Sequence, residues 1–300
     1  MPAWVYVELM SMNGVLKFTV VSVWLATMGW LIRYEAFAHI FDPTLQGYRE
    51  LSKNLPALRD SWMKIVSGGQ HVGYINSSIE MVDFQGEEQL HMGTQVLLKV
   101  WVNGDLELFR LNNKVQLNAR QKLIGSVSTF AVGLYSGNIT IEPVSGENSF
   151  MLSFRLNDLK FKREINLPAG AVISSPIMDA GLRNVKVGRT VKIRSVDPFS
   201  PSGEVKTVEL TGLSSVKVKL PGESREVEVT TVAMKMGELV VEADVDEYGR
   251  ILRQETPFGL TFIQADAGDA MKIPKGQGFD PMNLLSGDSI SPFLKLQGRL

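Results

Sequence analysis

The chain contains no cysteine among its 300 residues. A disulfide scaffold, a thiol nucleophile, an iron–sulfur cluster and a cysteine-ligated zinc site are therefore excluded. Histidine is nearly as scarce: His39, His71 and His91 are too far apart in sequence to form a local metal motif. Neither a G-x-S-x-G elbow nor a Walker loop occurs. These absences predict a protein with no metal, no cofactor and no enzymatic activity.

No excess of charge of either sign is present. The 31 Lys and Arg residues balance 32 Asp and Glu residues, and the formal net charge is −1. Nucleic-acid binding is not expected, because it needs a basic footprint. Hydrophobic residues make up 44% of the chain and charged residues 21%. This composition excludes disorder for most of the chain, since disordered segments are poor in apolar residues.

One long uncharged run stands near the N-terminus, at residues 18–32. Extended back to residue 15 it has eighteen residues and one lysine, Lys17, near its end. Eighteen helical residues span about 27 Å, close to the thickness of a bilayer core. We expect a short tail at 1–13 and a transmembrane helix at 14–33. Its apolar and interfacial anchors are Phe18, Trp24, Trp30 and Ile32.

The run has no good small-x-small cleavage site, so an uncleaved signal-anchor is favoured over a removed signal peptide. A long domain follows, and long domains cross the membrane largely regardless of flanking charge. We therefore expect a single-pass protein of a bacterial inner membrane, with its C-terminal domain on the periplasmic side.

Residues 34–60 are expected to form a stalk with a short helix. Asp42-Pro43 is typical of a helix start, and Leu55-Pro56 should end the helix near Asn54. Apolar residues recur at helical spacing between these limits. They fit an amphipathic helix packed on the following domain, or an oligomerising stalk.

From residue 61 to about 270, alternation with period two predicts a mainly β protein with a large antiparallel sheet. Asn103-Gly104 and Gly68-Gly69 should form hairpin turns, and residues 246–249 another. Two strand sets, at 62–167 and 185–265, flank a crossover at 171–183. They could form one curved sheet or two packed sheets.

One hairpin can be predicted in register. Residues 215–220 and 225–230 read SVKVKL and REVEVT. Pairing Lys217 with Glu228 and Lys219 with Glu226 places opposite charges together on one face. The other face then holds four valines, which we expect to be buried: Val216, Val218, Val227 and Val229.

Two further features attract functional hypotheses. Asp244, Asp246 and Glu247 could bind a hard cation, but solvated carboxylates beside a turn are the favoured interpretation. Residues 271–300 are rich in Gly, Pro, Ser and Asp and should form a loosely held tail. Three apolar residues of this tail could dock a partner: Phe293, Leu294 and Leu296.

The β region also resembles a known one. Residues 61–65 read SWMKI and residues 69–74 read GQHVGY, while residues 245–260 read VDEYGRILRQETPFGL. This pattern of strands and glycine-containing turns resembles the β-rich part that precedes the enzyme domain of bacterial transglutaminase-like envelope proteins. The resemblance implies an extracytoplasmic β domain. The catalytic cysteine of that family is absent.

These observations favour a membrane-anchored scaffold or adaptor of a cell-envelope assembly concerned with transport or secretion, with protein partners. The alternative is a periplasmic binding module or carrier for an apolar ligand such as a lipid. A lined cavity would favour the carrier and a flat exposed patch the adaptor. A hydrolase built from residues distant in sequence is a third hypothesis.

Overall fold

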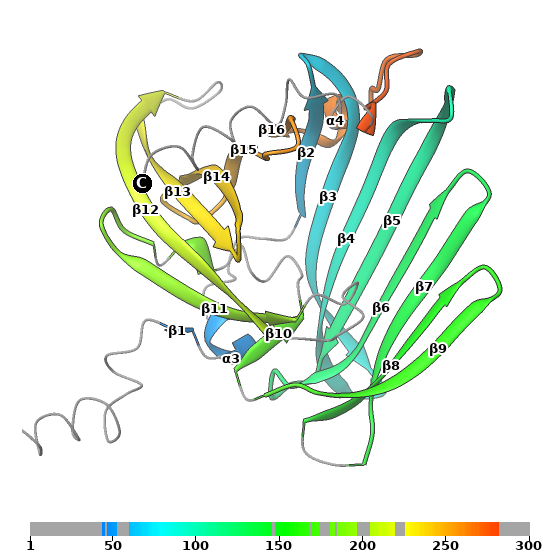
Figure 1. Ribbon diagram of the computed structural model, residues 1–300. Coiled ribbons are helices and arrows are strands. Elements are labelled where there is room, and N and C mark those ends of the chain that lie inside the picture. Colours follow the sequence, from blue (N-terminus) through cyan, green and yellow to red (C-terminus); the bar gives the residue numbers. More distant parts are fainter. Residues whose placement is uncertain are drawn as a thin grey trace, which may run out of the picture. The chain divides into compact units, whose positions relative to one another are not determined.

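The structure is a computed structural model, and it describes residues 44–45, 47–52, 60–145, 148–168, 170–173, 181–183, 185–196, 205–219 and 226–281. The chain divides into two compact units, residues 1–44 and 45–300. The second unit carries the strands from β2 onward, and they are shown in Figure 1.

The predicted membrane segment at 14–33 lies outside the described residues, with Phe18, Trp24, Trp30 and Ile32. The tail residues Phe293, Leu294 and Leu296 lie outside them as well. Among the residues that are described, no helix combines the length and the apolar character needed to cross a bilayer.

The described elements are almost all strands, which confirms the mainly β prediction. Two short helices are α3 (Gly47–Ser52) and α4 (Ala267–Ala270). The strands are β1 (Thr44–Leu45), β2 (Asp60–Ser67), β3 (Gln70–Phe84), β4 (Glu87–Val102), β5 (Asp105–Leu117), β6 (Leu123–Val132), β7 (Tyr135–Pro143), β8 (Ser149–Leu156), β9 (Leu159–Asn166), β10 (Ala171–Ile173), β11 (Thr190–Val196), β12 (Val205–Lys219), β13 (Glu226–Met236), β14 (Leu239–Asp246), β15 (Ile251–Glu255) and β16 (Leu260–Ala265).

One continuous sheet contains both predicted strand sets. Its order runs from β11 through β12 to β16 and then from β2 to β9. The two sets meet where β16 pairs antiparallel with β2, so that Ala265 faces Trp62 and Leu260 faces Ser67. From β11 through β16 to β9 the neighbouring strands are antiparallel, whereas β10 is parallel to its partner, β11. Of the two predicted arrangements, the single sheet is therefore correct.

The predicted turns join consecutive strands. Asn103 and Gly104, with φ angles of 54° and 89°, connect β4 to β5. Gly68 and Gly69, at 55° and 78°, connect β2 to β3. A two-residue hairpin turn of type I′ needs positive φ at both central residues, which asparagine and glycine tolerate best. The Asn-Gly and Gly-Gly pairs therefore predict these turns because these residues tolerate the positive φ angles that the structure shows.

The β12–β13 hairpin has the predicted register. Lys217 pairs with Glu228 and Lys219 with Glu226, and the valines face one another. The burial prediction is right for only one strand. Val227 and Val229 are 4% and 6% exposed, whereas Val216 is 55% exposed. Val218 is half-buried. Alternation identifies the face of a strand, but burial also requires something to cover that face.

Three clusters of buried side chains form the core. In the largest, residues of β3, β4 and β5 pack against residues of β11 to β14 and against α3. In the second, residues of β7, β8 and β9 pack against Ile173 of β10 and Val196 of β11. The third lies on β2, β3 and β4. Strands far apart in the sheet order therefore share a core, which requires the sheet to curve strongly.

Helix α3 falls inside the predicted helical segment and packs on the β domain. Tyr48 and Leu51 are 6% and 0% exposed and belong to the largest cluster. The Tyr48 hydroxyl accepts a hydrogen bond of 2.8 Å from the N–H of Ile173. These contacts support the packed amphipathic helix of the two predicted alternatives.

The first part of the predicted loose tail is docked instead. The N–H of Phe279 donates to the carbonyl of Lys99, and the N–H of Trp101 donates to the carbonyl of Phe279, both at 2.8 Å. Lys99 Nζ also donates to the carbonyl of Pro274. Proline and glycine content indicates the lack of regular structure, but it does not exclude pairing with an available strand edge.

Candidate ligand-binding pocket

A pocket of about 810 Å³ lies at one end of the sheet. Four segments form it: the β5–β6 turn, the β7–β8 loop, the segment between β9 and β10, and the start of α3. Figure 1 shows that these segments lie near one another although they come from distant parts of the sequence. The volume is within the range of small-molecule sites, roughly 300–1,000 Å³.

The β5–β6 turn is held in shape by one side chain. Asn118 Oδ1 accepts hydrogen bonds of 3.0 Å from the backbone N–H groups of both Arg120 and Lys122. The N–H of Gln121 donates to the Asn118 carbonyl at 2.7 Å, and Gln121 has a φ of 58°. This asparagine-centred turn fixes the backbone from which two cationic side chains reach the pocket.

A close backbone contact brings α3 to the β9–β10 segment. A Cβ atom on Gly47 would lie only 3.1 Å from Gly170 Cα, and Gly47 has a φ of 70°. A larger residue at Gly47 would push the two segments apart. The adjacent Tyr48–Ile173 hydrogen bond holds the same two segments together. Burial raises the pKa of the Tyr48 hydroxyl, although its hydrogen bond from Ile173 acts in the opposite direction.

The pocket has an apolar part and a cationic part. Its apolar lining consists of the half-buried Leu123 and Ile124 and of Phe150, Leu167 and Ala171, which are buried at 8%, 5% and 8% exposure. Arg120 and Lys122 are exposed. The described residues that line the pocket are Gly47, Tyr48, Arg49, Asn118, Ala119, Arg120, Gln121, Lys122, Leu123, Ile124, Pro143, Asn148, Ser149, Phe150, Leu167, Pro168, Gly170 and Ala171. Among these described lining residues there are three cations and no carboxylate.

The sequence did not reveal this pocket. Its residues come from four segments that strand pairing and core packing bring together, and no local motif links them. The single local signal is the polar turn at residues 118–122, between two apolar alternating stretches. That signal predicts a turn and says nothing of a ligand.

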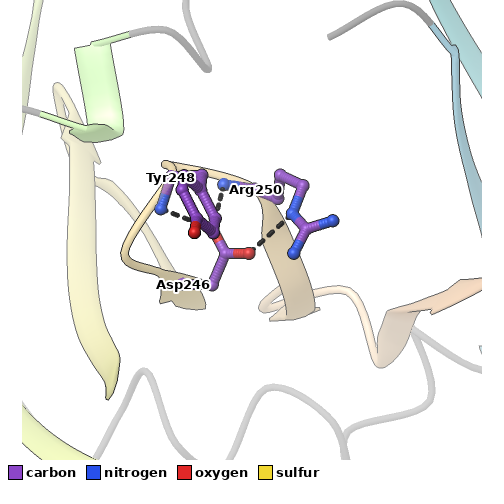
Figure 2. Close-up of polar contacts among 3 residues, drawn as sticks. All are labelled: Asp246, Tyr248 and Arg250. Atoms are coloured by element: carbon purple, nitrogen blue, oxygen red, sulfur yellow. Dashed lines mark hydrogen bonds and ion pairs between the residues drawn. The ribbon is translucent and has the colours of Figure 1, made fainter. Parts of the chain in front are cut away.

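The acidic turn at residues 246–250 is held together by hydrogen bonds that Asp246 accepts within the turn (Figure 2). Asp246 Oδ1 accepts from the backbone N–H groups of Tyr248 and Arg250, at 2.9 and 2.8 Å. Asp246 Oδ2 accepts from Arg250 Nε at 2.6 Å. Asp246 is 5% exposed, so the expectation of a solvated carboxylate is wrong for this residue.

A cation at this turn is not supported. Both oxygens of Asp246 already accept hydrogen bonds, and Asp244 Oδ1 accepts from Thr231 Oγ1 at 2.8 Å. The Arg250 guanidinium lies 5.5 Å from the centre of the Tyr248 ring. The charge of Asp246 is compensated inside the turn, which stabilises the β14–β15 hairpin.

His71 and His91 lie on different strands and have separate partners. His71 Nε2 is 2.9 Å from the carbonyl oxygen of Gly73. His91 Nε2 is 3.1 Å from Gln89 Oε1 and 3.3 Å from Gln116 Nε2. In the part of the chain that the structure describes, no three His, Asp or Glu side chains gather closely enough to hold a metal ion. His39 lies outside that part.

Comparison with known proteins gives only distant likenesses. No protein-family model matches the chain, and no curated protein matches it significantly. A β-barrel-like protein of the domain of unknown function DUF1849 from Brucella abortus is similar with a TM-score of 0.45 at 7% identity, over 69% of this chain and 95% of that one. A DUF1089 family protein from Pseudomonas aeruginosa gives a TM-score of 0.33 at 14% identity, over 62% and 90%.

Proposed function

We propose that this protein is a non-enzymatic binding module that holds a ligand with a substantial apolar part in the pocket at residues 118–124. The observation that carries the proposal is the pocket of about 810 Å³, whose apolar lining includes the half-buried Leu123 and Ile124 beside the buried Phe150. Removing apolar surface from water contributes roughly 25 cal/mol per Å². An apolar chain placed against these residues therefore gains affinity without any specific polar contact.

The lining supports binding more than chemistry. Ser149 and Tyr48 are the hydroxyl groups among the described lining residues, and none of those residues is a His, Asp or Glu that could activate them. Nucleophilic catalysis needs such a base within hydrogen-bond reach. The Tyr48 hydroxyl is already engaged by the N–H of Ile173.

Binding of a neutral dye tests the proposal. Nile red should bind the wild-type protein and gain fluorescence. Ala119→Trp, on the exposed turn that lines the pocket, should reduce this binding about tenfold by filling space. The matched control is Ser136→Trp, an exposed position at the β6–β7 hairpin that does not line the pocket. Absence of dye binding, or equal loss in both variants, would contradict the proposal.

The setting we propose is a periplasmic domain tethered to the inner membrane, on the basis of the uncharged run at residues 18–32. The full-length protein should resist extraction by alkaline carbonate, and added protease should digest its β domain in spheroplasts. Release by carbonate would exclude the anchor, and protection from protease would exclude the orientation.

A second candidate function, an adaptor for a protein partner, is supported by the free side of β9. Among the described strands β9 pairs only with β8. Its Leu159 and Phe161 are 61% and 36% exposed, and Phe161 stacks on Phe154 with ring centres 4.9 Å apart. An edge strand of this kind can accept a strand of another protein.

Co-purification from membranes tests the adaptor. Phe161→Asp should reduce recovery of partner proteins, whereas Phe258→Asp, at an exposed position in the β15–β16 turn, should not. Unchanged recovery with Phe161→Asp would exclude docking at β9. Deletion of residues 282–300 tests separately whether the tail with Phe293, Leu294 and Leu296 contributes.

A further inference from the structure

We infer that the ligand of this pocket is an anionic amphiphile, a long apolar chain ending in a carboxylate or phosphate group whose charge lies against Arg120. This inference rests on the proposed binding function and names its ligand class.

The charge of the lining is the first observation. The chain as a whole is balanced, with 31 basic and 32 acidic residues. The described lining has Arg49, Arg120 and Lys122 and no carboxylate. An anion in this pocket gains favourable Coulomb energy from the cationic side chains of the lining, above all from Arg120. A neutral ligand does not.

The arrangement of the lining is the second observation. The three cationic residues are exposed, whereas the apolar lining residues Leu123 and Ile124 are half-buried. An amphiphile matches this arrangement when its chain lies against the apolar lining and its head group lies at the exposed cations. A small inorganic anion would leave the apolar surface of the pocket in water.

The β5–β6 turn supplies the third observation. Asn118 Oδ1 holds the N–H groups of Arg120 and Lys122 together, so the Cα atoms that carry both side chains are fixed before a ligand binds. A prearranged pair loses less conformational entropy on binding than two side chains on a loose loop. Arginine can also bind a carboxylate or a phosphate with two parallel hydrogen bonds.

Displacement of Nile red by four competitors tests the inference. The probes are decanoate, decyl phosphate, decan-1-ol and inorganic phosphate. With the wild-type protein, each of the two anionic decyl compounds should displace the dye at concentrations about tenfold lower than decan-1-ol. The advantage should shrink between 50 and 500 mM salt, because exposed charges are screened. Inorganic phosphate should not displace the dye.

A charge-removing double variant identifies the residues. Arg120→Gln with Lys122→Gln should weaken displacement by decanoate and decyl phosphate about tenfold and leave decan-1-ol unchanged. The matched control is Arg110→Gln with Lys114→Gln, which removes two exposed cations of β5 outside the lining. This control variant should leave the displacement of Nile red by each of the four competitors unchanged.

The outcomes separate the two proposals. If decan-1-ol displaces the dye as well as the anionic compounds do, the pocket binds apolar ligands and the anionic inference is wrong. If inorganic phosphate displaces Nile red, the pocket binds anions in general, and the inference that its ligand is an amphiphile is wrong. If wild-type protein binds no dye and no decyl compound, the proposed function itself fails. Equal losses in both double variants would overturn the assignment to Arg120 and Lys122.

Discussion

Strand β4 contributes side chains to two clusters of the core, the largest one and the third. Toward its start, Leu90 and Met92 are 8% and 0% exposed and face side chains of β11 to β14 in the largest cluster. Toward its end, Leu98 and Val100 are each 9% exposed, and Val96 and Val102 on the same face are half-buried in the third cluster. The residue types are similar in both halves. The difference shows that the end of this apolar face is covered less completely than its start, where residues of β11 to β14 pack on it.

A polar row marks the boundary between the two halves. Ser77, Thr94, Asn113 and Ser128 lie side by side on β3 to β6, according to the strand register. Ser128 is 1% exposed, and its Oγ donates to Asn113 Oδ1 at 3.0 Å. The hydrogen bond satisfies groups that would otherwise be costly to bury. The row therefore separates the largest cluster, which is the closed core, from the third cluster.

Truncating one isoleucine in each half should give the largest contrast. Ile193→Ala, at a fully buried position of the closed core, should lower the free energy of unfolding by about 2–5 kcal/mol. Ile75→Ala, at a half-buried position of the other half, should cost less than about 1.5 kcal/mol. Urea unfolding measures both. Equal costs would mean that Ile75 is covered as completely as Ile193.

Tyr48→Phe should cost about 1–3 kcal/mol, because it leaves the N–H of Ile173 without its acceptor in a buried place. The ring itself is retained, so the loss reports the hydrogen bond. Tyr135→Phe, at a 60% exposed position, is the control and should be neutral. A neutral Tyr48→Phe would show that water can replace the hydroxyl.

For the valines of the β12–β13 hairpin, the loss of stability on truncation to alanine should depend on how deeply each side chain is buried. Val227→Ala should cost about 1.5 kcal/mol, from the loss of two buried carbon groups. Val216→Ala, on the facing strand and 55% exposed, should cost less than about 0.5 kcal/mol. Thermal unfolding of the two variants checks this. A larger loss at Val216 would indicate a covering layer.

The smallest effect is expected from pH. His91 is 8% exposed, and burial and the nearby Lys114 lower its pKa, while Glu80 opposes this. The folded state then binds the proton more weakly than the unfolded chain. Stability should therefore be complete above the ordinary histidine pKa of about 6.5 and fall as the pH decreases through it. His91→Gln should reduce this fall in urea midpoints between pH 7.5 and 5.5. An identical fall in both proteins would exclude His91 as its source.

Local signals were sufficient for part of this fold. The Asn103-Gly104 and Gly68-Gly69 turns and the Lys217–Glu228 pairing were predicted because each depends on residues close in sequence. Turn chemistry and charge pairing act over a few residues and leave a pattern that can be read.

The long-range features left no such pattern. The pairing of β16 with β2 joins segments nearly two hundred residues apart, and either strand alone would fit another neighbour. The exposure of Val216 depends on what covers its face, and the pocket depends on four converging segments. The curvature of the sheet determines the β16–β2 pairing, the exposure of Val216 and the pocket. The alternation of apolar and polar residues along a strand does not predict that curvature.

The β16–β2 pairing also sets the order in which this protein can be completed. Trp62 pairs with Ala265, so the early strand β2 keeps an open edge until β16 has been made. At ~5–20 residues per second, synthesis of the intervening roughly 200 residues takes about 10–40 s. During that time the nascent chain presents β2 to any strand that reaches it. Folding of the nascent chain thus depends on the synthesis of β16, and any delay before β16 prolongs the time during which the open edge of β2 can aggregate.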